Sequence, residues 1–223
     1  MTIRRLMAAR EAVKNARLYL ILGCEAGEGR DPLEVAAAAV AGGVELIQIR
    51  LKSVTTKERI EFCRRLRKCC GTSCPPIIVN DDLEAAIGAE AAGVHVGQDD
   101  VPVAQARKQA GDRLIVGLST HSPAQAEEAE AAGADYAGIG AIFPTETKQI
   151  EHLIGPEPLE ELPGRVGIPV FAIGGVTLAN LERIISRGCR KVAVSSAILE
   201  ADDPEAAART FHQRLWESGP IIR

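Results

Sequence analysis

Two pairs of adjacent aspartates in this sequence each come just after a short apolar segment with the composition of a β-strand. The pairs are Asp81 and Asp82, after residues 77–80, and Asp99 and Asp100, after residues 94–96. An Ala-rich helical segment joins the two strands, which predicts that they run parallel and end at the same edge of a sheet. We therefore expect the two acidic pairs to face each other, with Asn80 and Gln98 beside them.

Carboxylates that converge in this way suit Mg²⁺, a hard cation that keeps several waters and collects phosphate oxygens. A purely structural role is the alternative: one Asp of each pair would cap the helix that follows, and the other would be solvated. In the same segment, Gly93 is expected to end the helix in the left-handed conformation.

The composition favours small-molecule chemistry over binding to nucleic acid or membrane. The chain has 223 residues, a net charge of -4 and only 3% aromatic residues, whereas a nucleic-acid surface needs basic patches and stacking platforms. No apolar run approaches the length that spans a bilayer. The cysteine spacing matches no standard zinc or disulfide pattern, which indicates reduced thiols in a cytoplasmic protein. The cysteines are Cys24, Cys63, Cys69, Cys70, Cys74 and Cys189.

Helices and short β-branched strands alternate along the whole chain. Four helices are expected to end at a glycine, namely Gly43, Gly93, Gly133 and Gly188, and three to begin at a cap followed by proline, namely Asp31, Ser122 and Asp203. Eight strands are predicted, at residues 18–22, 44–50, 77–80, 94–96, 115–119, 136–139, 170–173 and 191–194. Eight βα units without a linker predict an α/β fold, a (β/α)8 TIM barrel, in one domain over residues 18–217. Residues 1–17 form a helical extension, and residues 218–223 a tail.

Polar residues alternate at the end of the second strand, in the order Gln48, Arg50 and Lys52. Because the outer face of a barrel strand packs on apolar helices, this trio should point inward and toward the mouth. Two inward cations need an anion, which a bound phosphate or pyrophosphate would supply. An ion pair with Asp81 or Asp100 is the structural alternative.

The later strands also end in residues that suit anion binding, since barrel enzymes carry their sites at the carboxyl ends of the strands. Ser119 ends the fifth strand, and a long connection after the sixth carries Thr145, Thr147 and Lys148 as a lid. A Gly-Gly pair ending at Gly175 follows strand seven, and Ser195 and Ser196 follow strand eight. Loops after strands seven and eight commonly hold a phosphate through backbone N–H groups. Two separate anion sites make two phosphorylated substrates plausible.

Taken in order, the segments QIRLK, VNDD, HVGQDD, GLSTHS, PTETK, IGGV and VSSAI resemble the thiamine-phosphate synthase family, also called thiamine-phosphate pyrophosphorylase. The resemblance runs from about residue 19 to residue 207. It implies a transferase that condenses hydroxymethylpyrimidine pyrophosphate with thiazole phosphate, giving thiamine phosphate and pyrophosphate with Mg²⁺ as cofactor. The sequence leaves a homodimer open.

The resemblance also implies a role for each matching residue. The pyrimidine pyrophosphate would contact Gln48, Arg50, Lys52 and Asn80, and Mg²⁺ would bind Asp81 and Asp100. The leaving pyrophosphate would contact Ser119 and Lys148. The thiazole substrate would contact Thr145 and Thr147, and its phosphate would contact Gly175, Ser195 and Ser196. Of these, Arg50, Lys52, Ser119 and Lys148 are the expected catalytic residues. Ser195 stands where the family usually has an aliphatic residue, and the segment after Lys148 also departs from the family pattern.

Other functions remain open at this point. A thiazole tautomerase-like paralogue would isomerise thiazole phosphate and need a general acid or base, for which His121 is the candidate. A sugar-phosphate isomerase or epimerase would share the Gly-Gly segment but has no use for Asp81, Asp100 and the lid together. A non-catalytic sensor would bind thiazole phosphate without turnover.

Overall fold

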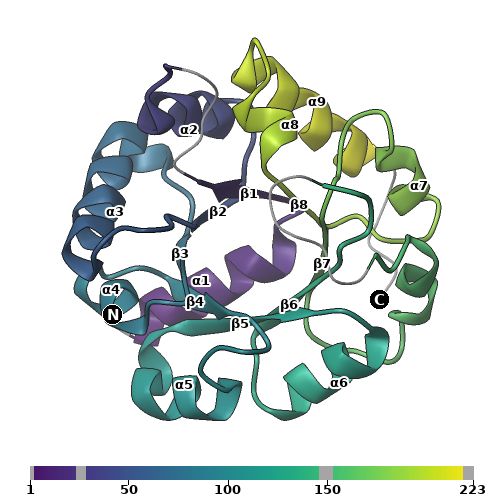
Figure 1. Ribbon diagram of the computed structural model, residues 1–223, viewed down its shortest axis with the longest axis horizontal. Helices are drawn as coiled ribbons and strands as arrows, with labels where there is room; N and C mark the ends of the chain where they lie inside the picture. Colours follow the sequence, from purple (N-terminus) through teal and green to yellow (C-terminus); the bar gives the residue numbers. More distant parts are fainter. Residues whose placement is uncertain (1–2, 24–28, 146–152, 218–223) are drawn as a thin grey trace.

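Eight parallel strands form a closed barrel in the order β1 to β8, with helices around the outside (Figure 1). This is a computed structural model, and it describes residues 3–23, 29–145 and 153–217. The strands are β1 (Leu18–Leu22), β2 (Leu46–Ile49), β3 (Ile77–Asn80), β4 (Gly93–Val96), β5 (Ile115–Thr120), β6 (Tyr136–Ile139), β7 (Val170–Ile173) and β8 (Val192–Val194). The predicted TIM barrel is confirmed.

The helices follow the strands as βα units require, except that α1 precedes β1 and that the described part of the connection after β6 contains only a 3₁₀ turn. They are α1 (Ile3–Asn15), α2 (Pro32–Ala41), α3 (Thr56–Cys70), α4 (Leu83–Gly88), α5 (Val103–Ala110), α6 (Pro123–Ala131), α7 (Leu181–Ile185), α8 (Ser196–Leu199) and α9 (Pro204–Glu217), with short 3₁₀ turns η1 (Gly71–Ser73), η2 (Gly111–Arg113) and η3 (Glu157–Glu161). None of these helices is long and apolar enough to cross a membrane.

Local capping signals placed most helix ends correctly. Asp31 accepts a hydrogen bond from the Leu33 N–H at 2.9 Å, and Ser122 and Asp203 cap α6 and α9 in the same way. Three of the four expected left-handed glycines have positive φ, namely Gly43, Gly133 and Gly188.

The expectation for Gly93 was wrong. Gly93 is the first residue of β4, and the left-handed residue after α4 is Glu90, with φ 50°. The reason for glycine at position 93 is packing within the barrel. A Cβ there would lie 2.5 Å from the Ile115 carbonyl oxygen of the neighbouring strand, so the position excludes a side chain.

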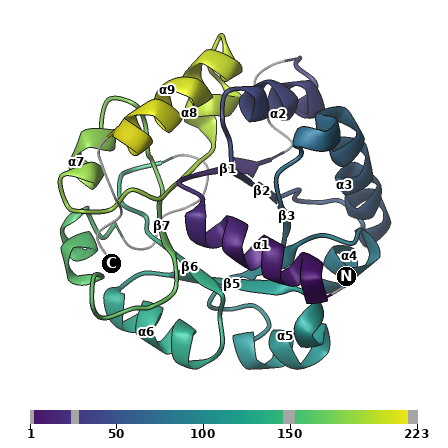
Figure 2. The same cartoon turned by 180° about the vertical axis from the view of Figure 1, so that it is seen from behind.

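Helix α1 closes the amino-terminal end of the barrel. It lies behind the ring of strands in Figure 1 and in front of it in Figure 2, across the barrel axis. Its buried residues Leu6, Ala9 and Val13 pack into one cluster with the inward side chains of the strands, including Leu46 and Ile115. Burying a Leu or Val side chain contributes roughly 1.5–3 kcal/mol, so this helix is an integral part of the core.

Large aromatic side chains fill the middle of the barrel. The rings of Tyr19, Tyr136 and Phe171 meet edge to face, with centroids 5.3–6.0 Å apart. Gly117 makes room for them, because a Cβ at this position would lie 2.2 Å from the Tyr136 ring. The barrel is therefore solid below its carboxyl end, and the polar residues collect above this layer.

Candidate functional site

The end of β2 presents the predicted polar residues to the barrel mouth. Gln48 is 3% exposed, and its Nε2 donates to the Tyr19 hydroxyl at 2.9 Å inside the barrel. The Arg50 N–H donates to the Leu22 carbonyl at 2.8 Å, which extends the pairing of β1 and β2 by one residue. Arg50 is half-buried and Lys52 is exposed. Among the described residues neither lies within 4.0 Å of a carboxylate, so their charges remain available to an anion.

The carboxylates of Asp81 and Asp100 come together, as the strand pattern predicts. Partial burial of the Asp81 carboxyl and its contact with Asp100 raise the pKa of Asp81 to about 6, and the positive charge of Arg50 partly opposes this rise. The Asp81 N–H donates to the His95 carbonyl at 2.8 Å, and Asn80 donates to the Asp81 carboxylate. Asp100 accepts from the Gly97 N–H at 2.7 Å.

These two carboxylates fit a magnesium ion that substrate phosphates help to hold. Bringing like charges together is unfavourable unless a proton or a cation lies between them. Within the described ranges no group of three or more metal-ligating side chains occurs, so Asp81 and Asp100 would need further oxygens from water and phosphate. Mg²⁺ is typically bound in this way, by one or two carboxylates with substrate phosphates.

The other two aspartates have different roles. The Asp82 carboxylate caps α4 by accepting from the Ala85 N–H at 2.7 Å, so the structural alternative is correct for this residue. It is wrong for the second pair, because α5 begins after Pro102 without a side-chain cap. Asp99 is exposed beside Asp100.

A buried chain of hydrogen bonds links β2 to β5 inside the barrel. From the Tyr19 hydroxyl, which Gln48 contacts, it continues to the Tyr136 hydroxyl at 2.9 Å and on to His95 Nδ1 at 2.9 Å. His95 Nε2 then lies 3.0 Å from Ser119 Oγ. The chain therefore connects two predicted site residues, Gln48 and Ser119, through three side chains that sequence analysis did not assign to the site.

The direction of this chain follows from its first donor. The Gln48 amide nitrogen donates to Tyr19, and the Tyr19 hydroxyl is satisfied if it donates to Tyr136. Tyr136 then donates to His95 Nδ1, which leaves the proton on Nε2, facing Ser119. The opposite direction would leave the buried Tyr19 O–H without an acceptor in this chain, at a cost of roughly 1–3 kcal/mol. In this direction Ser119 would accept from His95 and could donate its own proton to a ligand in the mouth.

Burial lowers the pKa of His95 from 6.5 to about 4, so its ring is neutral at pH 7. The unfolded chain takes up this proton near pH 6.5, and the folded chain only near pH 4. Between these values the unfolded state binds more protons, so folding stability falls as the pH drops from 6.5 to 4.

Because glutamine cannot titrate, we expect the free energy of unfolding of His95→Gln to fall by about 3 kcal/mol less than that of the wild type as the pH drops through this range. The measurement is the free energy of unfolding by urea at pH 7.5 and 4.5, for wild type and variant. Both proteins contain the same carboxylates, whose titration affects both equally. The difference between the two pH dependences of the unfolding free energy is therefore the contribution of His95. Identical pH dependences would contradict the prediction.

The second predicted anion site lies at the ends of β7 and β8. Gly174 and Gly175 have φ of 96° and 62°, and the Phe143 N–H donates to the Gly174 carbonyl at 3.0 Å. A Cβ on Gly175 would lie 2.3 Å from the Pro144 carbonyl oxygen. The lid segment and the glycine pair therefore pack backbone to backbone, which only glycine permits.

Ser195 and Ser196 follow β8 and start the short helix α8. The Ser195 hydroxyl donates to the Ile21 carbonyl at 2.9 Å, which ties the ends of β8 and β1 together. The departure from an aliphatic residue at this position is thus accommodated within the barrel wall, and the Ser195 carbonyl accepts from the N–H groups of Ile198 and Leu199 at 3.0 Å. In the lid, Thr145 is half-buried, whereas Thr147 and Lys148 lie outside the described residues.

His121, the candidate base of a tautomerase, is held by the backbone. Its Nδ1 lies 2.5 Å from the Gly140 carbonyl oxygen, and its N–H donates to the Gln125 side chain at 2.6 Å. His121 Nδ1 therefore donates its proton to the Gly140 carbonyl, and this hydrogen bond joins the ends of β5 and β6. The cysteines of the described ranges, Cys63, Cys69, Cys70, Cys74 and Cys189, are free thiols.

Comparisons with known proteins identify the family of this chain. The family model described as thiamine monophosphate synthase matches residues 18–198. The thiamine-phosphate synthase of Natronomonas pharaonis is 43% identical over 92% of this chain and 97% of its own length, and that of Bacillus velezensis is 40% identical over 94% and 96%. The solved thiamine phosphate pyrophosphorylase from Pyrococcus furiosus superimposes with a TM-score of 0.81 at 32% identity, covering 94% of this chain and 98% of that chain. The chain therefore belongs to the thiamine monophosphate synthase family.

Proposed function

We propose that this protein condenses 4-amino-2-methyl-5-hydroxymethylpyrimidine pyrophosphate with 4-methyl-5-(2-phosphooxyethyl)thiazole, giving thiamine phosphate and pyrophosphate, in the cytoplasm and with Mg²⁺. That it is an enzyme, a transferase of thiamine biosynthesis, follows from its family. The observation that carries the finer proposal is the pairing of Asp81 with Asp100 near the cation Arg50, because this combination serves a pyrophosphate and a metal together.

The residues fall into two groups that match the two substrates. Gln48, Arg50, Lys52 and Asn80 would hold the pyrimidine pyrophosphate, and Ser119 and Lys148 would contact the pyrophosphate as it leaves. On the opposite side of the mouth, Thr145 and Thr147 would contact the thiazole, and the backbone of Gly175, Ser195 and Ser196 its phosphate. The structure supports this division by separating β2–β5 from β7–β8 around the ring (Figure 1).

In the proposed reaction the bond between the pyrimidine methylene carbon and the pyrophosphate oxygen breaks, and the aminopyrimidine ring stabilises the resulting cation. The thiazole nitrogen then forms the new carbon–nitrogen bond. That nitrogen has no proton to lose, so the site needs no strong general base, in agreement with a neutral, fully hydrogen-bonded His95. Asp81 and Asp100 would hold Mg²⁺, which supplies positive charge for the departing pyrophosphate. Arg50, Lys52 and the Ser119 O–H would stabilise the same group, and the lid would exclude water from the cation.

A product assay tests this proposal. Purified protein is mixed with both substrates, with Mg²⁺ or with chelator, and thiamine phosphate is followed by chromatography. Metal-dependent product is the expected result. If no product forms while thiazole phosphate still binds, the protein is instead a tautomerase-like paralogue or a sensor, and His121 is the residue to replace.

Lys148→Ala is expected to lower kcat by about 100-fold while leaving the affinity for thiazole phosphate within a few-fold of wild type. Its proposed partner is the leaving pyrophosphate, whose charge develops only in the transition state. Steady-state kinetics and calorimetric binding of thiazole phosphate separate the two effects. Equal losses in kcat and affinity would show that the lid serves binding alone.

A further inference from the structure

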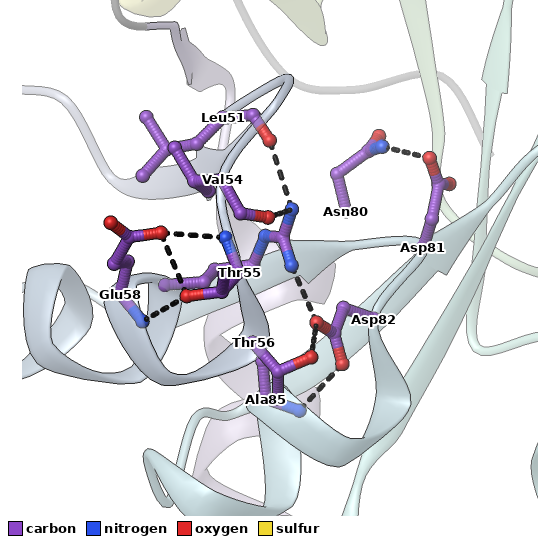
Figure 3. Close-up of polar contacts among 10 residues, drawn as sticks. Leu51, Val54, Thr55, Thr56, Glu58, Asn80, Asp81, Asp82 and Ala85 are labelled. Carbon is purple, nitrogen blue, oxygen red and sulfur yellow. Dashed lines mark hydrogen bonds and ion pairs between the residues drawn. The ribbon is translucent and has the colours of Figure 1, made fainter.

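The guanidinium of Arg59 joins the two segments that carry the proposed pyrophosphate and metal residues. Arg59 lies on the first turn of α3, and its Nη2 donates to the carbonyl oxygens of Leu51 and Val54 at 3.0 and 3.4 Å. These carbonyls flank Lys52 in the connection after β2. Its Nη1 forms an ion pair with Asp82, next to Asp81, at 2.5 Å. Figure 3 shows these contacts converging between the Leu51–Val54 segment and Asp82.

The Asp82 carboxylate is fixed from three directions. One oxygen accepts from the Ala85 N–H at the start of α4, and the other accepts from the Thr56 hydroxyl at 2.8 Å and from Arg59. The side chains of Arg59 and Asp82 are only 13% and 16% exposed. Partial burial reduces competition from water, so the guanidinium holds both segments in one arrangement.

Both segments carry a residue in the left-handed backbone region. Ser53 has φ 58° and Asp81 has φ 61°, and only one other described non-glycine residue, Glu90, has positive φ. Such conformations are unfavourable for residues with a Cβ and persist only where the surroundings enforce them. The Arg59 contacts enclose Ser53 between Leu51 and Val54, and end at the residue next to Asp81.

We propose that Arg59 is a positioning residue that sets the Lys52 segment and the Asp81 carboxylate relative to each other for one Mg²⁺-bound pyrophosphate. The proposal rests on the proposed function for the identity of that ligand. We assign Arg59 no contact with the substrate, because its Nη1 and Nη2 groups bind Asp82 and the two carbonyls. Its effect on the site is exerted through the backbone of residues 51–54 and 81–82.

Arg67 provides a matched control on the same helix. It lies two turns after Arg59, is half-buried in the same way, and donates to the carbonyls of Ala89 and Glu90 at 3.1 and 3.2 Å. It therefore ties α3 to the end of α4, whereas Arg59 ties α3 to the start of α4. A role of Arg59 in stability alone would be shared by Arg67, and a role in the site would not.

The test compares Arg59→Gln, Arg59→Lys and Arg67→Gln in the full chain. Binding of inorganic pyrophosphate is measured by calorimetry with and without Mg²⁺, and kcat and the unfolding temperature are measured beside it. Arg59→Gln is expected to weaken Mg²⁺-dependent pyrophosphate binding by about 10- to 100-fold, the usual effect of losing a group that orients metal ligands. Arg59→Lys keeps the ion pair with Asp82 but loses the paired carbonyl contacts, so its affinity should lie between. Arg67→Gln should lower the unfolding temperature and leave pyrophosphate affinity unchanged.

Amide hydrogen exchange gives a readout that needs no ligand. Arg59→Gln should speed exchange at Asp81, whose N–H is bonded to the His95 carbonyl, and across residues 51–55, without changing β6 to β8. Unchanged exchange in these segments, or equal losses of pyrophosphate affinity in Arg59→Gln and Arg67→Gln, would overturn the proposal. If Arg59→Gln does not fold, Arg59→Lys decides the question. Exchange rates and a pyrophosphate affinity equal to those of the wild type in Arg59→Lys would overturn the proposal. Failure of the wild type to make thiamine phosphate would instead refute the proposed function, and the exchange comparison would still decide the role of Arg59.

Discussion

Replacing Asp81 and Asp100 together by asparagine is expected to abolish Mg²⁺-dependent formation of thiamine phosphate. Asparagine keeps the shape and one oxygen of each side chain but removes both negative charges, which a cation and its pyrophosphate require. Losing one electrostatic contact in a transition state typically costs about 10² to 10³ in rate, and this change removes the whole carboxylate pair. Steady-state turnover over a range of Mg²⁺ concentrations measures the effect.

The fold should survive this double replacement. The two carboxylates repel each other in the free protein, so their removal is expected to leave the unfolding temperature unchanged or to raise it. Asp99→Asn is the matched control, because it removes a charge adjacent to Asp100 from an exposed side chain and should keep full turnover. Full turnover of the double variant in the presence of chelator would refute the metal site.

Gly175→Ala is expected to remove productive binding of thiazole phosphate. Its φ of 62° is unfavourable for alanine, and the new methyl group would lie 2.3 Å from the Pro144 carbonyl oxygen and 2.7 Å from that of Phe143. The β7 end and the lid segment must then move apart, and a displacement of about 1 Å at such a site can cost about 100-fold. The KM for thiazole phosphate should rise steeply, while pyrophosphate binding at the opposite side of the mouth should not change.

Gly188→Ala separates backbone strain from the clash. Gly188 also has positive φ, 80°, but a Cβ there meets no atom within 4 Å, and the residue lies before β8 at the other end of the barrel. It should lose roughly 1–2 kcal/mol of stability and keep its kinetic constants. A normal KM for thiazole phosphate in Gly175→Ala, or the same rise in both variants, would place the thiazole phosphate elsewhere.

The architecture of this protein is largely readable from local patterns. Caps such as Asp31 and Ser122, left-handed glycines such as Gly133, and short β-branched segments mark helix and strand ends through interactions within a few residues. Eight repeats of this pattern predict the barrel, and the barrel predicts that chemistry collects at the carboxyl ends of its strands. The pairing of Asp81 with Asp100 and the inward position of Gln48 therefore follow from strand order and alternation, and the structure confirms both.

What the sequence could not determine depends on groups that are distant along the chain. Which aspartate of the first pair caps a helix depends on Arg59 and Thr56 in the preceding βα unit. The chain from Gln48 to Ser119 runs through Tyr19, Tyr136 and His95, each of which looks like an ordinary core residue in its own strand.

The sequence by itself therefore determined the barrel and the end of the barrel at which the polar residues collect, because strand periodicity and helix caps act locally. Tertiary structure alone decided which carboxylates pair with each other and which one caps a helix, and that α1 closes the opposite end of the barrel. These outcomes depend on closure of the barrel, which brings β1 beside β8 and places side chains more than 100 residues apart within hydrogen-bond distance.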